Sequence, residues 1–309
     1  MIGTVYQSTG LWYKVKLESG QFIECRLKGK LRLDDLKTTN PVAVGDSVNV
    51  EKDDSGKNLM ITGVEKRHNY IIRSSPRHKA KNHIIGANLD QSLLVVSLKS
   101  PRTRLGFIDR FLVSCEMYHV PPIILFNKCD LYKAKEMAKF EELKALYESI
   151  GYPVHLVSAE EKEGLAIIKD IIADKVTLIS GQSGVGKSSL LNALIDLDIK
   201  TKVVSGYNEK GQHTTTYATM YDIPEGGSII DTPGIKMLGL INLEPEEVSH
   251  YFPEMRSLLN ECKYQNCSHL TEPNCAIIDS FEKGEIAESR FIAYEVIYNE
   301  VKETNHWER

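Results

Sequence analysis

The sequence lacks any long hydrophobic run. None of its apolar stretches approaches the roughly 18 residues that a membrane-spanning helix needs. The first residues do not show a basic segment followed by an apolar one, which is the layout of a signal peptide. Internal repeats and low-complexity tails are also missing. We therefore expect a cytoplasmic protein with no membrane partner.

A strong excess of charge of one sign is missing as well. The formal net charge of −4 comes from 38 lysines and arginines against 42 aspartates and glutamates. This balance excludes a chain that is basic throughout, although it is compatible with a local basic patch. A hydrophobic fraction of 42% and a charged fraction of 26% are typical of a globular protein. With 309 residues, the chain is long enough for about two or three domains.

Cysteine is scarce and unevenly distributed. Three of the six cysteines are scattered, and we expect them to be reduced structural thiols: Cys25, Cys115 and Cys129. The other three fall within 14 residues around a histidine, with the spacing C-x4-C-x-H-x5-C. Clustering of this kind favours a metal site over disulfides.

The cluster predicts a structural zinc site. Three thiolates and one imidazole fill a tetrahedral Zn²⁺ shell, which leaves no position for a catalytic water. The alternative is three unconnected cysteines beside an unrelated histidine, but this core-poor segment is one that a metal would stabilise. The predicted ligands are Cys262, Cys267, His269 and Cys275.

Residues 1–68 have the pattern of an all-β domain. Alternating or β-rich segments occur at 11–18, 21–27, 41–51 and 58–64, separated by turn residues. About five short strands in this length favour a small closed barrel of the OB type, a fold that commonly binds oligonucleotides. The alternative is an SH3-like or other small barrel that serves only as a spacer.

Residues 66–83 are strongly basic and contain no acidic residue. Fixed positive charges at this density suit a phosphate backbone, although a solvated linker between domains has the same composition. The candidate RNA contacts are Arg67, Arg73, Arg77, Lys79 and Lys81.

Residues 69–240 alternate between buried strands and helices, with the basic segment at their entry. The alternation predicts an α/β domain with a largely parallel sheet, whose functional loops follow the carboxyl ends of the strands. The predicted strands are 93–97, 123–126, 154–157 and 176–179, and the predicted helices are 107–118, 140–150 and 165–172.

A glycine-rich loop follows the strand at 176–179 and matches GxxxxGK[ST]. Its glycines allow tight turns in which backbone N–H groups point at phosphate oxygens, and the next helix adds its positive dipole end. We expect Lys187 to reach the β- and γ-phosphates and Ser188 to bind Mg²⁺. The predicted contacts are Gly181, Gln182, Ser183, Gly184, Val185, Gly186, Lys187, Ser188 and Ser189.

A guanine-recognition motif, NKxD, ends the strand at 123–126. It consists of Asn127, Lys128, Cys129 and Asp130. The Asp130 carboxylate can accept from both N–H donors of guanine, a pair that adenine does not offer. We expect Asn127 to brace the loop and Lys128 to lie along the base and ribose. The backbone N–H of Ala159, next to Ser158, is expected to meet the guanine oxygen.

A metal and switch region completes the nucleotide site. Asp231 begins a DxxG motif and is predicted to hold Mg²⁺ through water, while the N–H of Gly234 meets the γ-phosphate. The run at 211–216, GQHTTT, supplies a threonine for the metal shell. We favour Thr215 among the three threonines.

The residue that follows DxxG is Ile235, where Ras-like enzymes carry a water-orienting glutamine. Slow intrinsic hydrolysis is therefore expected. His213 is the candidate for positioning the water, and its alternative interpretation is a surface histidine in a mobile loop. The predicted catalytic set is His213, Lys187 and Thr215.

These motifs stand in an unusual order, because NKxD precedes the phosphate loop. An ordinary GTPase begins with the phosphate loop, so the same cyclic order cut elsewhere indicates a circular permutation. Residues 241–309 then predict a helical module around the metal cluster, with an apolar core stripe in the helix at 281–301. Cys262 follows Gly234 by only 28 positions, so we expect the switch to re-aim this module directly.

The combination of NKxD, the permuted phosphate loop, GQHTTT, DxxG and the Cys/His cluster resembles the RsgA family along essentially the whole chain. The resemblance implies a multidomain α/β protein with an OB-like barrel, a circularly permuted P-loop GTPase domain and a C-terminal zinc module. It also implies a barrel that contacts ribosomal RNA and a partner, the small ribosomal subunit, that stimulates GTP hydrolysis late in its maturation. The family carries a histidine at the position of His213 and an apolar residue at that of Ile235.

Two other functions compete with this interpretation. A guanine-nucleotide-sensing RNA-binding protein with little turnover has the same modules, but the intact Lys187, Ser188 and Asp231 favour a GTP hydrolase. A translation or tRNA-modification GTPase is disfavoured because no modification domain is added. GTP and GDP are the expected ligands, Mg²⁺ and Zn²⁺ the expected metals, and a monomer the expected state.

Overall fold

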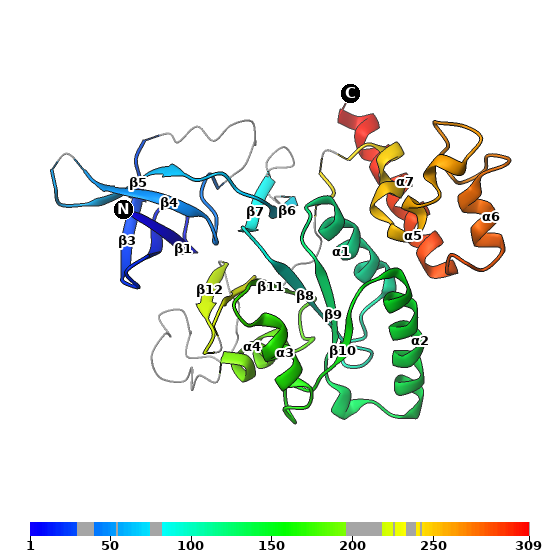
Figure 1. Ribbon diagram of the computed structural model, residues 1–309, viewed down its shortest axis with the longest axis horizontal. Coiled ribbons are helices and arrows are strands. Elements are labelled where there is room, and N and C mark those ends of the chain that lie inside the picture. The colour runs from blue at the N-terminus through cyan, green and yellow to red at the C-terminus, as the bar shows by residue number, and fades with distance from the viewer. Residues whose placement is uncertain are drawn as a thin grey trace.

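The computed structural model describes residues 1–29, 40–53, 55–74, 82–195, 218–224, 226–232, 239–241 and 243–308. They form a β-barrel, an α/β domain and a helical module in chain order (Figure 1). No helix in these ranges combines the length and apolarity needed to cross a membrane.

The N-terminal barrel closes through its first and fourth strands. Its strands are β1 (Ile2–Ser8), β2 (Tyr13–Leu17), β3 (Phe22–Leu27), β4 (Ser47–Lys52) and β5 (Leu59–Val64). The order is β1-β2-β3-β5-β4 with an additional β1–β4 pairing, and β3 runs parallel to β5. Alternation places a small apolar set inside, including the fully buried Val15, Val48 and Ile61. This closed five-stranded arrangement confirms the predicted OB-like barrel.

The central domain is a parallel sheet with helices on both faces, as predicted. Its parallel strands lie in the order β10-β9-β8-β11-β13. Two hydrophobic clusters line the faces, one with α1 and α2 and the other with α3 and α4 (Figure 1). The elements are β8 (Gln91–Val96), α1 (Leu105–Met117), β9 (Pro122–Phe126), η1 (Cys129–Leu131), α2 (Ala134–Ile150), β10 (Val154–Leu156), α3 (Leu165–Ile172), β11 (Val176–Ser180), α4 (Lys187–Ile195) and β13 (Ser228–Asp231).

One sheet runs through both the barrel and the central domain. The short strand β12 (Thr219–Asp222) pairs antiparallel with β13 and also with β1 of the barrel. Gln7 lies opposite Thr219, and Thr219 lies opposite Asp231, so three strands are in register across the domain boundary. The sequence analysis did not predict this junction, because an edge pairing between distant segments leaves no local pattern.

The basic segment contains one strand and ends in another. Strands β6 (Tyr70–Ser74) and β7 (Asn82–Ala87) pair antiparallel, with Arg73 opposite His83. The predicted contacts Arg77, Lys79 and Lys81 lie outside the described residues. The described residues on either side of this gap therefore form a two-stranded antiparallel sheet.

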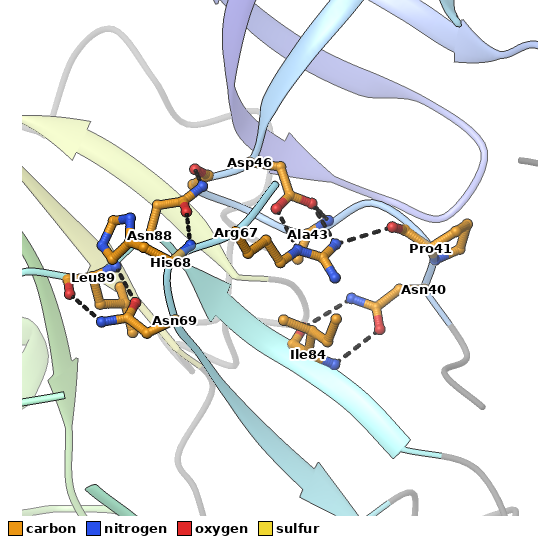
Figure 2. Close-up of polar contacts among 11 residues, drawn as sticks. Asn40, Pro41, Ala43, Asp46, Arg67, His68, Asn69, Ile84, Asn88 and Leu89 are labelled. Carbon is orange, nitrogen blue, oxygen red and sulfur yellow. Dashed lines mark hydrogen bonds and ion pairs between the residues drawn. The ribbon is translucent and has the colours of Figure 1, made fainter. Parts of the chain in front are cut away.

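Hydrogen bonds and an ion pair connect the residues around β6 and β7 to residues 40–46 and to the start of the central domain (Figure 2). Arg67 donates from Nε and Nη2 to the two carboxylate oxygens of Asp46, at 2.6 and 2.7 Å, and from Nη2 to the carbonyl of Pro41 at 3.0 Å. The Asn40 side chain exchanges two hydrogen bonds with the backbone of Ile84. The Arg67 guanidinium, which the sequence analysis predicted as an RNA contact, is engaged with Asp46 and Pro41 inside the protein, and only 9% of the side chain is exposed.

The helical module packs against α1 of the central domain. Arg290 is fully buried and donates to Asp109 of α1 at 2.9 Å and to Glu254 at 2.6 and 3.1 Å, while its guanidinium lies 4.6 Å from the Phe252 ring centroid. Tyr294, Ile297 and Val301 are buried, which confirms the apolar core stripe. The elements are η2 (Pro245–Tyr251), α5 (Pro253–Arg256), η3 (Leu259–Glu261), α6 (Ala276–Glu282) and α7 (Glu288–Glu308).

We predict that Arg67→Ala destabilises the protein by about 3–5 kcal/mol, because it leaves the fully buried Asp46 carboxylate without its ion-pair partner. The midpoint of urea unfolding, followed by circular dichroism, measures this change. Lys66→Ala removes an exposed charge next in the sequence and is the matched control. Unchanged stability of the Arg67 variant would restore a surface role for this arginine.

Candidate functional site

The predicted phosphate loop lies between β11 and α4 and requires glycine at two crowded positions. Gly181 has φ +148°, and a Cβ there would lie 2.2 Å from the carbonyl oxygen of Val95. Gly186 has φ +95°, and a Cβ there would lie 2.3 Å from the Asn127 amide nitrogen. Both the backbone conformation and the close approach therefore exclude a side chain at these positions.

Lys187 lies inside the loop that precedes it. Its Nζ donates to the carbonyl oxygens of Gly181 and Gln182, both at 2.7 Å, and only 9% of the residue is exposed. Burial lowers the pKa of this lysine, and the Asp231 carboxylate opposes the shift. The Lys187 ammonium is thus held by the backbone of the phosphate loop, and a bound phosphate can replace these carbonyl oxygens as its acceptor.

Asn127 joins three loops through its carboxamide and backbone. Its Nδ2 donates to the carbonyl of Val185 at 2.8 Å, and its Oδ1 accepts from the backbone N–H of Ala159 at 3.1 Å. Its own N–H donates to the Val96 carbonyl at 2.8 Å. The Ala159 N–H, expected to meet the guanine oxygen, is engaged with Asn127 in this structure.

Ser158 orients the Asp130 carboxylate. Its hydroxyl donates to Asp130 Oδ1 at 2.6 Å and accepts from the backbone N–H of Glu161 at 3.1 Å. Ser158 is fully buried, whereas Asp130 is exposed, so the oriented carboxylate stays accessible to a ligand. Next to it, burial and the Glu163 carboxylate raise the pKa of the Cys129 thiol to about 12, which keeps the thiol protonated.

A cavity of about 180 Å³ opens between these loops. Lys128 adopts a left-handed conformation with φ 68°, and its Nζ donates to the Gly184 carbonyl at 2.7 Å and to the Ser100 carbonyl. The cavity therefore has a cation-bearing wall on one side and an oriented carboxylate on another. The lining residues are Asn127, Lys128, Asp130, Leu131, Ala159, Glu160, Gly186 and Ser189.

Tyr132 also supports this site, and the sequence analysis missed it. Its hydroxyl donates to the backbone carbonyl of Asn127 at 2.8 Å and accepts from the backbone N–H of Leu98 at 2.9 Å. It therefore ties the end of β8 to the end of β9. The available signal was an aromatic hydroxyl two positions beyond NKxD.

The predicted Mg²⁺ ligands come from adjacent strands. Asp231 ends β13 opposite Ile179 of β11, and Ser188 is in the first turn of α4 beyond the loop. A carboxylate and a hydroxyl with neighbouring phosphates are the oxygen donors that Mg²⁺ prefers, so these residues fit the ion. His213, Thr215, Gly234 and Ile235 lie outside the described residues.

The Cys/His cluster has tetrahedral dimensions. Its four ligand atoms lie within 4.8 Å of one another. The sulfurs of Cys262 and Cys275 are 3.8 Å apart, and the His269 Nδ1 lies 3.5 and 3.3 Å from them. A tetrahedron with Zn–S bonds of about 2.3 Å and a Zn–N bond of about 2.1 Å has edges of about 3.8 and 3.6 Å. The cluster of Cys262, Cys267, His269 and Cys275 therefore fits a metal ion of this size.

The barrel carries an aromatic and basic surface on β2 and β3 that the sequence analysis also missed. Trp12 and Phe22 are each 43% exposed. The Arg26 guanidinium lies 4.1 Å from the Trp12 ring centroid, and the Lys14 ammonium lies 4.7 Å from that of Phe22. Alternate positions on one face of a two-stranded ribbon create this surface, which also contains the exposed Glu24 opposite Lys14. It becomes recognisable only once the strand register is known.

Comparisons with known proteins agree with this geometry. A family model described as RsgA GTPase matches residues 64–241, and one described as RsgA N-terminal domain matches residues 2–60. The small ribosomal subunit biogenesis GTPase RsgA of Bacteroides fragilis strain YCH46 is 48% identical over 295 residues, covering 95% of each chain.

Two crystal structures are similar in fold over nearly the full chain. YjeQ from Thermotoga maritima has a TM-score of 0.76 and 34% identity, covering 97% of this chain and 98% of that one. YloQ, described as a circularly permuted GTPase, has a TM-score of 0.73 and 30% identity, covering 98% and 95%.

We predict that Ser158→Ala weakens GDP binding by about tenfold or more, because Asp130 loses the donor that orients it and a charge-assisted hydrogen bond is worth about 1.5–3 kcal/mol. Fluorescence titration with a methylanthraniloyl GDP analogue measures the affinity. Ser149→Ala, which removes an exposed hydroxyl on α2, should leave it unchanged. Equal affinity of both variants would show that Asp130 needs no support from Ser158.

Proposed function

The chain belongs to the RsgA family of GTPases, and from this we propose that it binds the small ribosomal subunit and acts in its late maturation, hydrolysing GTP to GDP and phosphate when the subunit stimulates it. The observation that carries the proposal is the near full-length similarity to a relative named for this role, at 48% identity. The braced cavity at Asn127 and Asp130, beside an intact phosphate loop, supports guanine-nucleotide binding by this chain.

Within the nucleotide site, we assign guanine to the cavity between Asp130 and Lys128 and the phosphates to the loop Gly181–Ser189. The buried ammonium of Lys187 neutralises phosphate charge that develops during transfer. Ser188, Asp231 and Thr215 would hold Mg²⁺, and the ion would supply positive charge beside the phosphates. Gly234 contributes its backbone N–H to the γ-phosphate.

The site lacks a glutamine after DxxG, and we infer from this that hydrolysis needs stimulation by the subunit. Ile235 cannot orient water as a glutamine does. We assign this task to His213, which the bound subunit brings into position. Slow hydrolysis by the free protein is the expected consequence.

For RNA contact, we propose the surface formed by Trp12, Lys14, Phe22 and Arg26 on the barrel, together with Arg73, Arg77, Lys79 and Lys81. Exposed aromatic rings paired with cations are typical of proteins that stack bases and neutralise phosphates. The cation-π contacts at Trp12 and Phe22 support this assignment. The alternative barrel role, a spacer, gives no reason to expose two aromatic rings beside basic side chains.

We assign the Cys/His cluster to one structural Zn²⁺. Its atom spacing and its full shell of protein ligands support zinc without a catalytic water. We retain the division into residues 1–68, 69–240 and 241–309, a monomeric state and a cytoplasmic location as predictions that accompany the function.

The central prediction is that purified small ribosomal subunits raise the rate of GTP hydrolysis strongly, whereas large subunits do not, and ATP is not a substrate. Lys187→Ala should abolish GTP binding and turnover yet keep most of the affinity for RNA. Lys135→Ala, an exposed lysine on α2, is its matched control. Binding of GTP without stimulation would favour the alternative, a guanine-nucleotide-sensing RNA-binding protein with little turnover.

A second prediction concerns the metal. The purified protein should contain about one zinc ion per chain by mass spectrometry of metals, and Cys262→Ser should lose it because a ligand is gone. Cys25→Ala, which removes a buried thiol from the barrel, should keep the metal. A different ion, or retention of zinc by the Cys262 variant, would contradict the assignment.

A further inference from the structure

The junction between the barrel and the central domain lies close to the nucleotide site. Gln7 of β1 pairs with Thr219 of β12, which pairs with Asp231, the predicted Mg²⁺ ligand. In the sequence, β12 begins just after the threonine run at 214–216. The first strand of the barrel is therefore two strands away from Asp231, one predicted Mg²⁺ ligand. The strand between them, β12, follows in the sequence the run that contains Thr215, another predicted ligand.

A β-bulge in β1 directs Tyr6 across this junction. The register shifts between Val5 and Gln7, and Tyr6 belongs to the buried cluster that contains Met220 and not to the one inside the barrel. Its ring also meets Phe22 of β3 edge-on, with 5.1 Å between the ring centroids. Bulges commonly re-aim a side chain in this way. The Tyr6 hydroxyl donates to Asp222 Oδ1 of β12 at 2.5 Å.

Asp222 is also held by a lysine from the barrel. Lys16 Nζ donates to Asp222 Oδ2 at 2.7 Å, and the Ser228 hydroxyl of β13 donates to Oδ1 at 3.4 Å. The side chains of Lys16 and Asp222 are 30% and 45% exposed, so solvent and a partner can reach the ion pair. An exposed pair of this kind is weak enough to be exchanged for a stronger one.

The same lysine belongs to the aromatic and basic surface of the barrel. Its Nζ lies 5.4 Å from the Tyr6 ring centroid and 5.9 Å from that of Phe22. The Lys14 ammonium also lies over the Phe22 ring. A phosphate on this surface offers Lys16 the same charge-assisted hydrogen bond that Asp222 supplies. The lysine therefore has two competing anionic partners, one in the protein and one in a bound nucleic acid.

We propose that the Lys16–Asp222 contact is a latch between the barrel and the nucleotide site, which a phosphate of bound single-stranded RNA opens by taking Lys16 from Asp222. The inference rests on the proposed RNA contact of the barrel and names its regulation. Loss of Lys16 leaves Asp222 with only Tyr6 and Ser228 as side-chain donors and removes the neutralising charge from β12, the strand that leads from the threonine run to the β13 edge. RNA binding and nucleotide binding are thus coupled through one carboxylate, and the coupling is reciprocal.

Stimulated GTP hydrolysis is the first test. We expect Asp222→Asn and Lys16→Ala to reduce the ratio of subunit-stimulated to free turnover by about two- to fivefold, the range set by an exposed ion pair. The double variant should resemble either single variant, because both remove one contact. Asp170→Asn on α3 and Lys52→Ala on the barrel are charge-matched controls at exposed positions.

A binding assay separates this proposal from the proposed function. An oligouridylate of about 12 nucleotides, within the site size of one OB fold, should change the affinity of the unmodified protein for a fluorescent GDP analogue, and Asp222→Asn should remove most of that change. If subunits do not stimulate the unmodified protein, the proposed function fails, whatever the variants do.

If the unmodified protein is stimulated but Asp222→Asn behaves as Asp170→Asn, the latch is overturned. If the coupling appears with whole subunits and never with the oligouridylate, the proposal that single-stranded RNA opens the latch is overturned.

Discussion

The nucleotide site depends on one buried carboxamide. Asn127 holds the phosphate loop through Val185 and the Ala159 loop through a backbone N–H, and it is only 1% exposed. Gly186 has to lack a side chain because this amide occupies the space that a Cβ would need. Three segments that are far apart in the chain thereby keep one geometry. The pocket for the base and the loop for the phosphates are parts of a single hydrogen-bonded unit.

Much of this could be predicted from the sequence, because short motifs encode local chemistry. The GxxxxGK[ST] loop, NKxD and the spacing of Cys262 and Cys275 each specify residue types that a phosphate, a base or a metal requires. The strands of the central sheet were equally predictable, since continuous apolar runs indicate strands buried on both faces. The OB-like barrel followed from alternation and turn spacing.

The contacts between distant segments could not be predicted. Arg67 belongs to a basic run, yet it is paired with Asp46, and charge composition carries no information about which partner a folded chain offers. Tyr132 and Ser158 act through backbone and carboxylate partners that only the fold brings near. The same holds for the surface around Trp12, whose neighbours are set by strand register.

The described contacts fasten the helical module to α1 through Arg290. That bond joins residues 181 positions apart, and both side chains are almost completely buried. During synthesis, Asp109 is therefore made long before Arg290, the cation that compensates its charge in the folded protein. The last helix, α7, therefore neutralises a charge on the much earlier helix α1. A chain truncated before Arg290 would keep Asp109 buried without its cation, and its lower stability would distinguish it from the finished protein.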